Sequence, residues 1–267
     1  MRLIACDLDG TILHPDETIS ERTVHAFLAA RDAGVEIVFV TGRPFRWLGP
    51  VQRAFGHLGT VICSNGALVY DLEEETVLEA KTVDGDLVRD ARRLILGLEP
   101  GARFAAETTS GLYLEPGFVE PGEARLLEGV VPAEFPMDRL SEEGVVKFLA
   151  KSDEYTADEF LRAVHPTIGH LVSVTHSAPR VALLEMARHD VNKAASLEVY
   201  AAGLGLEAAD VVAFGDMPND VEMLAWAGRG YAMGSGHPLA KAAAGSVAET
   251  LANDGVARVI EDLLRRG

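Results

Sequence analysis

The sequence predicts an α/β protein in which a doubly wound, Rossmann-like parallel sheet carries an inserted α+β domain. Short apolar runs of four or five residues alternate with helical patterns toward both ends of the chain, which is typical of parallel strands connected by helices. Between residues 82 and 188 this alternation gives way to strand-like segments interrupted by prolines. We therefore expect residues 1–81 and 189–267 to form one domain, and residues 82–188 to form an inserted cap.

The first apolar run, from Leu3 to Cys6, is typical of a buried strand and ends in two carboxylates. Asp7 and Asp9 lie two residues apart, so both point to the same side of an extended chain, and Gly10 lets the backbone turn beside them. Ligands bind at such strand ends in open α/β sheets. Two close carboxylates repel each other unless a cation or a shared proton relieves them, and Mg²⁺ suits these oxygens. The alternative is an acidic turn that caps a helix.

A second strand end carries small polar residues. Residues 20–33 form a helical pattern, and residues 36–40 form the next buried strand. Pro44 fits the first turn of a helix, where its missing N–H costs little. Thr41 and Gly42 would then lie between a strand end and a helix N-terminus, where a hydroxyl and backbone N–H groups can bind an anion. A simple helix cap is the alternative for Thr41.

Two residues near these strand ends are candidate substrate contacts. Arg43 is either an anion contact or an ordinary surface residue. The third apolar run ends in Asn65-Gly66, which is a turn signal by itself but again falls at a strand end. Residues 67–70 and 76–79 flank an acidic turn and predict a hairpin.

The inserted domain mixes helices with strands of alternating polarity. Its expected helices are residues 84–98 and 157–164, and its expected strands are residues 103–106, 112–114, 145–149, 171–175 and 181–186. His176 and Arg180 lie near strand ends and are candidate substrate contacts, although a solvated surface position is the common role for such residues. A domain inserted over a strand-end site could close over a substrate and exclude water.

The last third of the chain supplies a lysine and a further acidic strand end. Asn192 precedes a helix that begins at Lys193, and a lysine in the first turn opposes the helix dipole. We expect this lysine to neutralise nearby anions, with an incidental surface position as the alternative. The strand at 210–214 leads to Asp216, which should point at the same sheet edge as Asp7.

Together, these strand-end residues suit phosphoryl transfer. Asp7 is the candidate nucleophile, because an aspartyl-phosphate splits one difficult displacement into two. Asp9 could protonate the leaving oxygen and later take a proton from water. Mg²⁺ would be held by Asp7, Asp216 and the backbone carbonyl of Asp9. The residues expected to bind the phosphate are Thr41, Gly42, Lys193 and Gly10, and those expected to support the site from the next helix are Asn219 and Asp220.

The motifs closely resemble those of the haloacid dehalogenase-like hydrolases. They are DLDGT at 7–11, VTGR at 40–43, Lys193, and GDMPND at 215–220. Their order, the insertion and NGA at 65–67 resemble the Cof-type, class IIB-capped phosphatases. The resemblance covers the whole chain and implies Mg²⁺-dependent hydrolysis of small phosphate monoesters, often sugar phosphates, in the cytoplasm.

Two segments depart from the family pattern. The usual G-V-S-K-G reads DVNKA at 190–194, which keeps the lysine and a capping residue. The common M-G-N-A reads MGSG at 233–236 and loses an asparagine.

Composition narrows the classes of partner. The chain has 267 residues, with 41 acidic and 24 basic side chains and a formal net charge of −17. Such a surface repels nucleic acid and anionic membranes, so a small phosphorylated metabolite is the expected partner. No signal segment or membrane-spanning run is recognised, and Cys6 and Cys63 lie in apolar runs typical of free thiols. We expect a cytoplasmic protein that is a monomer or a small homo-oligomer.

Two other functions share these residues. A phosphomutase acting on sugar phosphates would also use Asp9 as acid and base, while keeping water from the aspartyl-phosphate. A non-catalytic sensor of phosphorylated metabolites would be expected to lose Asp7, Asp9 or Lys193, and all three are present.

Overall fold

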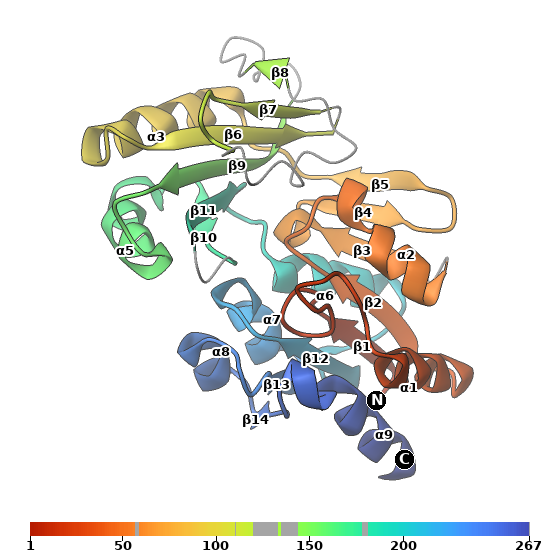
Figure 1. Cartoon of the computed structure of the whole chain (residues 1–267). Coiled ribbons are helices and arrows are strands. Elements are labelled where there is room, and N and C mark those ends of the chain that lie inside the picture. Colours follow the sequence, from red (N-terminus) through yellow and green to blue (C-terminus); the bar gives the residue numbers. More distant parts are fainter. Residues whose placement is uncertain (57–58, 110, 120–132, 135–143, 178–180, 267) are drawn as a thin grey trace. The chain divides into compact units, whose positions relative to one another are not determined.

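The computed structural model describes residues 1–56, 59–109, 111–119, 133–134, 144–177 and 181–266, and Figure 1 traces the chain. The chain divides into two compact units. The core unit comprises Met1–Glu79 and Asn192–Gly267, and the inserted unit comprises Ala80–Val191. Arg180, a predicted substrate contact, lies outside the described residues.

A largely parallel sheet forms the centre of the core unit. Its described strands follow the order β14-β13-β12-β1-β2-β3-β4-β5. Neighbours from β14 to β3 are parallel, whereas β4 is antiparallel to β3. The strands are β1 (Leu3–Cys6), β2 (Glu36–Val40), β3 (Thr60–Cys63), β4 (Leu68–Asp71), β5 (Thr76–Ala80), β12 (Val211–Gly215), β13 (Arg229–Ala232) and β14 (Ser246–Val247). The chain order reverses at β1, which lies between β2 and β12, and this confirms the predicted doubly wound fold.

Helices pack on both faces of this sheet (Figure 1). The core helices are α1 (Glu21–Asp32), α2 (Gly49–Phe55), α6 (Lys193–Gly203), α7 (Val221–Trp226), α8 (Pro238–Ala243) and α9 (Gly255–Arg266). Val38 and Val40 of β2 share one apolar cluster with residues of α6, α7 and α8. Phe39 lies between them in the strand and therefore points to the other face, where its ring contacts Phe27 of α1 and Phe55 of α2 at centroid distances of 5.6 and 5.1 Å. Burial of each such aromatic ring contributes about 1.5–3 kcal/mol.

The prediction that an α-helix begins at Pro44 is wrong. Pro44 instead precedes a single 3₁₀ turn, Phe45–Trp47, and α2 begins only at Gly49. The reason is Pro50, because a proline is tolerated in the first turn of an α-helix but not in its interior. Thr41 and Gly42 therefore do not directly precede an α-helix. The dipole of an α-helix would not stabilise an anion bound at this strand end.

The inserted unit is an α+β layer. Its described strands follow the order β10-β11-β9-β6-β7-β8, antiparallel except between β7 and β8. They are β6 (Arg103–Thr108), β7 (Leu112–Leu114), β8 (Ala133–Glu134), β9 (Val145–Ser152), β10 (Ser173–Thr175) and β11 (Ala182–Ala187). Helices α3 (Gly85–Leu98) and α5 (Ala157–Ile168) pack against the sheet through a cluster that includes Phe104, Phe148 and Phe160. The sequence predicted both helices and most of the strands within a few residues.

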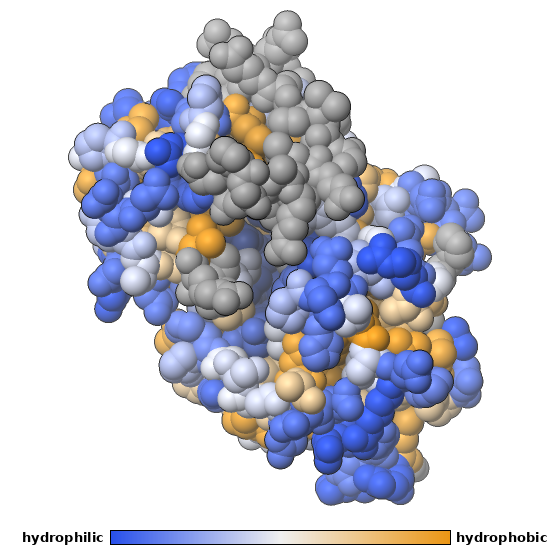
Figure 2. All heavy atoms as spheres, in the orientation of Figure 1, coloured by the Kyte–Doolittle hydropathy of each residue, from blue (hydrophilic) through white to orange (hydrophobic). Residues whose placement is uncertain are grey.

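The surface of the described residues is largely polar. The visible face of each unit is mostly hydrophilic, with smaller apolar areas (Figure 2). Among the described residues, no helix combines the length and the apolar character that crossing a membrane requires.

We predict that Gly230→Ala destabilises the core unit, whereas Gly203→Ala does not. A Cβ at Gly230 in β13 would lie 2.1 Å from the carbonyl oxygen of Leu224, so the strand or α7 would have to move, at a cost of about 1–3 kcal/mol. A Cβ at Gly203 in α6 meets nothing within 4 Å, and alanine is favoured over glycine in helices by about 1 kcal/mol. Thermal unfolding of the two variants measures the difference, and equal melting temperatures would contradict it.

Candidate active site

The carboxyl ends of three neighbouring strands bring the candidate residues together. In the sheet register, Cys6 of β1 pairs with Phe214 of β12 and with Phe39 of β2. Asp7 is the residue after Cys6, and its backbone N–H donates to the carbonyl of Phe214 at 3.0 Å. Asp216 follows β12 and Thr41 follows β2. The parallel register therefore gathers these three residues at one edge of the sheet.

Asp7 is the most enclosed acid of this edge. It is buried, and its Oδ1 accepts from Lys193 Nζ at 2.6 Å. Its Oδ2 accepts from the hydroxyl of Thr11 at 3.2 Å, and that hydroxyl also lies 3.5 Å from Asp216 Oδ1. Thr11 belongs to the DLDGT motif but was not predicted as a site residue. The residue thus connects the two acids that the sequence assigned to a metal.

Lys193 is the buried cation of the site. It is the first residue of α6, which Asn192 caps by accepting from the backbone N–H of Ala195 at 2.8 Å. Its ammonium has no exposed surface and donates to Asp7 and to Asp220, each at 2.6 Å. These two carboxylates therefore compensate for the unfavourable interaction of the lysine with the helix dipole.

Asp220 organises the loop after β12. Its Oδ1 accepts from Lys193, and its Oδ2 accepts from the backbone N–H groups of Asp216 and Met217, both at 2.9 Å. Because two of its three hydrogen bonds come from the backbone of this loop, Asp220 is suited to hold the loop in place. The sequence expected Asp220 to support the site, and this role stays a prediction.

Burial and mutual repulsion raise the pKa values of two acids of the site, Asp7 and Asp216. Burial is the largest cause that raises the pKa of Asp7, to about 7, while Lys193 acts to lower it and Asp220 adds to the rise. Burial, then Asp7 and Asp220, raise the pKa of Asp216 to about 9. Burial lowers the pKa of Lys193, but Asp220 and Asp7 outweigh burial, so it is raised and the ammonium keeps its charge. Three carboxylates thus lie near one another, and a single cation pairs with two of them, which leaves an excess of negative charge.

The acids fit a divalent cation with oxygen ligands. Asp7, Asp216 and Asp220 each offer a carboxylate oxygen within 4.8 Å of the others. Asp220 accepts three hydrogen bonds, two of them from the loop backbone, so Asp7 and Asp216 are the better candidates to hold Mg²⁺. Gly10 makes room for this arrangement, because a Cβ there would lie 2.3 Å from Asp216 Oδ2, and its φ of +79° suits glycine.

Asp9 lies in a different environment from Asp7. Its side chain is 55% exposed, and its two oxygens accept from Arg43 Nε at 2.7 Å and Nη2 at 2.8 Å. Arg43 Nη1 also lies 3.4 Å from Glu17 Oε1 and donates to the carbonyl of Trp47 at 3.2 Å. The sequence considered Arg43 as a contact to substrate and did not predict its pairing with Asp9.

Thr41 and Asn65 are linked through the backbone at neighbouring strand ends. The buried hydroxyl of Thr41 accepts from the N–H of Arg43 at 3.0 Å, and the Thr41 carbonyl accepts from the N–H of Asn65 at 3.0 Å. Gly42 lies between Thr41 and Arg43 and is partly buried. The predicted phosphate-binding residues Thr41 and Gly42 therefore belong to a hydrogen-bonded turn.

A left-handed turn places Asn65 against the loop after β12. Ser64 and Asn65 have φ values of +49° and +57°, and Gly66 has +102°. A Cβ at Gly66 would lie 2.4 Å from the carbonyl oxygen of Asn192, so the turn packs closely on the start of α6. Asn65 Oδ1 accepts from Asn219 Nδ2 at 2.9 Å, while the buried Oδ1 of Asn219 has no hydrogen-bond partner among the described residues. The Asn-Gly turn signal indicated this turn but not the partner of Asn65.

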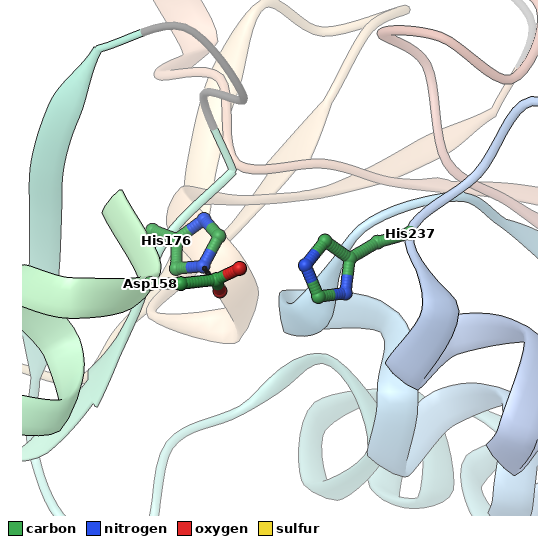
Figure 3. A group of neighbouring side chains, drawn as sticks. All are labelled: Asp158, His176 and His237. Atoms are coloured by element: carbon green, nitrogen blue, oxygen red, sulfur yellow. Dashed lines mark hydrogen bonds and ion pairs between the residues drawn. The ribbon is translucent and has the colours of Figure 1, made fainter. Parts of the chain in front are cut away.

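His176, another predicted substrate contact, belongs to the inserted unit. Its buried ring and Asp158 of α5 point toward one another in Figure 3, with 3.0 Å between Nε2 and Asp158 Oδ1. His237, also drawn there, belongs to the core unit, where its Nδ1 accepts from the N–H of Leu239 at the start of α8. A role of His176 in substrate binding stays a prediction.

Comparisons with known proteins found a matching family model and several similar proteins. A family model described as haloacid dehalogenase-like hydrolase matches residues 4–260. The chain is 29% identical over 252 residues to an HMP-PP phosphatase of Escherichia fergusonii, covering 90% of this chain and 87% of that protein. It is 28% identical over 273 residues to the pyridoxal phosphate phosphatase YbhA of Escherichia coli (strain K12), covering 97% of each. The solved structure of BT1666 from Bacteroides thetaiotaomicron shares the fold, with a TM-score of 0.81 and 24% identity over 98% of this chain and 94% of that one.

We predict that Asp216→Asn stabilises the metal-free protein increasingly as the pH rises. The folded state holds a proton on Asp216 up to a pKa of about 9, whereas an aspartate exposed to water has a pKa of about 4. The stability that this group contributes is therefore complete below about pH 4 and is lost as the pH rises through about 9, at up to about 1.4 kcal/mol per pH unit. The neutral asparagine avoids that loss.

The measurement is the melting temperature in EDTA between pH 5 and pH 9. The variant should gain on the wild type as the pH rises, by roughly 2–4 °C per kcal/mol. Asp32→Asn is the matched control, because Asp32 is exposed at the end of α1 and pairs with the neighbouring Arg31. An equal gain at every pH would show that the carboxyl group does not titrate as stated.

Proposed function

Because the chain belongs to the haloacid dehalogenase-like hydrolase family, we propose that it is a Mg²⁺-dependent phosphatase that hydrolyses small phosphate monoesters through an aspartyl-phosphate on Asp7. The observation that carries this proposal is the enclosure of Asp7 between a buried lysine and a second acid, at the end of a central strand. Such an arrangement holds a nucleophile beside the charges that a phosphoryl group requires.

In the first half of the reaction, a carboxylate oxygen of Asp7 attacks phosphorus and the bond to the leaving oxygen breaks. Asp9 gives its proton to that oxygen, so the leaving group departs as an alcohol. Lys193, Thr41 and the backbone at Gly42 and Gly10 are proposed to bind the phosphate oxygens. When bound by Asp7, Asp216 and the carbonyl of Asp9, Mg²⁺ would supply positive charge to nucleophile and phosphate.

In the second half, water attacks the phosphorus of the aspartyl-phosphate. Asp9, now ionised, accepts the proton of that water, and the bond between Asp7 and phosphorus breaks to release inorganic phosphate. Asp220 and Asn219 are proposed to keep Lys193 and the loop after β12 in place during both steps, in line with their hydrogen bonds to Lys193 and Asn65.

The proposed substrate class is a small phosphorylated metabolite, such as a sugar phosphate or a phosphorylated vitamin precursor. The relatives named above act, by their names, on HMP-PP and pyridoxal phosphate. We further propose that residues 82–188 form a cap that selects the substrate, with His176 and Arg180 as candidate contacts. A cytoplasmic location and a monomeric or small homo-oligomeric state are part of the same proposal.

We predict that the wild type releases phosphate only with Mg²⁺, and that Asp7→Asn lowers this activity by about 10³-fold or more. Asparagine keeps the shape of the side chain but is a far weaker nucleophile. The assay is phosphate release from sugar phosphates, nucleotides, pyridoxal phosphate and p-nitrophenyl phosphate, with Mg²⁺ or with EDTA. Asp32→Asn, on the surface of the same unit, should match the wild type.

Failure of this panel would have distinct meanings. Release that persists in Asp7→Asn would remove Asp7 as nucleophile. No release from any compound by the folded protein would overturn the phosphatase, and interconversion of sugar phosphate isomers without net release would then favour the phosphomutase.

A separate prediction concerns Asp9. In a two-step mechanism kcat/KM reports only the steps up to departure of the leaving group. Asp9→Asn should lower kcat/KM for pyridoxal phosphate, whose alkoxide needs a proton, by about 10²-fold or more. The loss for p-nitrophenyl phosphate, whose phenolate leaves readily, should be about 10-fold or less. Similar losses for both substrates would argue against an acid role of Asp9.

A further inference from the structure

Arg43 is held in place as a structural part of the core unit. Its side chain is only 14% exposed, although the loop in which it lies is near the surface. Its backbone N–H donates to the Thr41 hydroxyl, and its carbonyl accepts from the N–H of Ser64 at 3.0 Å. Its Nη1 donates to the carbonyl of Trp47. An ordinary surface arginine, which loses side-chain entropy when it is held, is rarely fixed at so many points.

The fixed guanidinium binds Asp9 through a bidentate pair of hydrogen bonds. Nε and Nη2 donate to the two oxygens of one carboxylate at 2.7 and 2.8 Å, which is the parallel arrangement that the planar guanidinium favours. The pairing determines which way the carboxylate plane of Asp9 faces. Because Arg43 is anchored by β2 and β3 through Thr41 and Ser64, the orientation of Asp9 depends on strands other than its own.

We propose that Arg43 is a positioning residue for Asp9, which sets its carboxylate for proton transfer, rather than a contact to substrate. This inference rests on the proposed phosphatase function. After Asp9 has given its proton to the leaving oxygen, the guanidinium keeps the carboxylate in a fixed orientation for the second step, in which Asp9 takes a proton from water. Proton donation itself requires that one Asp9 oxygen leave its hydrogen bond with Arg43.

The available donors support this role over direct substrate binding. Nε and Nη2 each donate to Asp9, and Nη1 donates to Trp47 and lies near Glu17. A substrate phosphate would have to compete with the carboxylate of Asp9 for the N–H donors of Nε and Nη2. Only a phosphate that took both of these donors would separate Arg43 from Asp9, and it would then remove the orientation that the anchored loop provides.

A residue that acts through Asp9 should show the same dependence on the leaving group as Asp9. We expect Arg43→Ala to lower kcat/KM for pyridoxal phosphate by about 10-fold and for p-nitrophenyl phosphate by no more than about 3-fold. In the Asp9→Asn background, Arg43→Ala should change kcat/KM by less than about 2-fold, because the residue through which it acts is already disabled.

Further variants keep the test decisive. Arg43→Lys retains the positive charge but has a single donor centre, so it should recover part of the loss on pyridoxal phosphate, and it carries the test if Arg43→Ala does not fold. Arg53→Ala is the matched control, because Arg53 is exposed on the neighbouring α2, and it should match the wild type on both substrates.

The outcomes separate this inference from the proposed function. Equal losses on both substrates, or losses that multiply in the double variant, would overturn the positioning role while leaving an active wild type and an inactive Asp7→Asn in agreement with the phosphatase. A loss that appears only as a higher KM on both substrates would return Arg43 to substrate binding. A wild type that releases no phosphate would overturn the function and the inference together.

Discussion

The site depends on one buried ion pair network, in which the ammonium of Lys193 lies between Asp7 and Asp220. An unpaired charge without exposed surface would be costly, so the lysine requires its acids as much as they require it. The network links three segments that are distant in sequence: the end of β1, the start of α6 and the loop after β12. Through Asp220 the network reaches the backbone of Asp216 and Met217, and so it also sets the position of Asp216. Local geometry and charge are therefore coupled at this edge of the sheet.

A deficit of positive charge follows from the same network. Lys193 pairs with two of three neighbouring carboxylates, and the raised pKa values of Asp7 and Asp216 follow first from burial and then from repulsion between the acids. At a protein surface, water would screen this repulsion, but Asp7 and Asp220 are buried. The arrangement costs stability and lies at the strand end that we propose as the binding site for a divalent ion and a phosphate; shifted pKa values of this kind are common at functional sites.

The sequence predicted the parts of this structure that depend on local patterns. Asp7 and Asp216 each follow an apolar run, and parallel strands must end at the same edge, so their proximity could be expected before the structure was known. Lys193 stood out because its place opposes the helix dipole. The pairing of Arg43 with Asp9 was not predictable in this way, because it depends on how two loops from different strands meet. The helix expected at Pro44 failed for a local reason that was available, since Pro50 determines where α2 can begin. The roles assigned to these residues stay predictions.

Asp7 and Asp9 illustrate how two identical side chains can be suited to different chemistry. They lie two residues apart, yet Asp7 is buried against an ammonium and a hydroxyl, whereas Asp9 is half exposed and gripped by a guanidinium. A nucleophile benefits from a fixed position beside the charges that receive the phosphate, and a group that both gives and takes a proton needs access to the leaving group and to water. The enclosed acid meets the first requirement and the exposed acid meets the second. The environments that the fold builds around the two carboxylates thus favour the assignment of Asp7 as nucleophile and Asp9 as acid and base, and not the reverse.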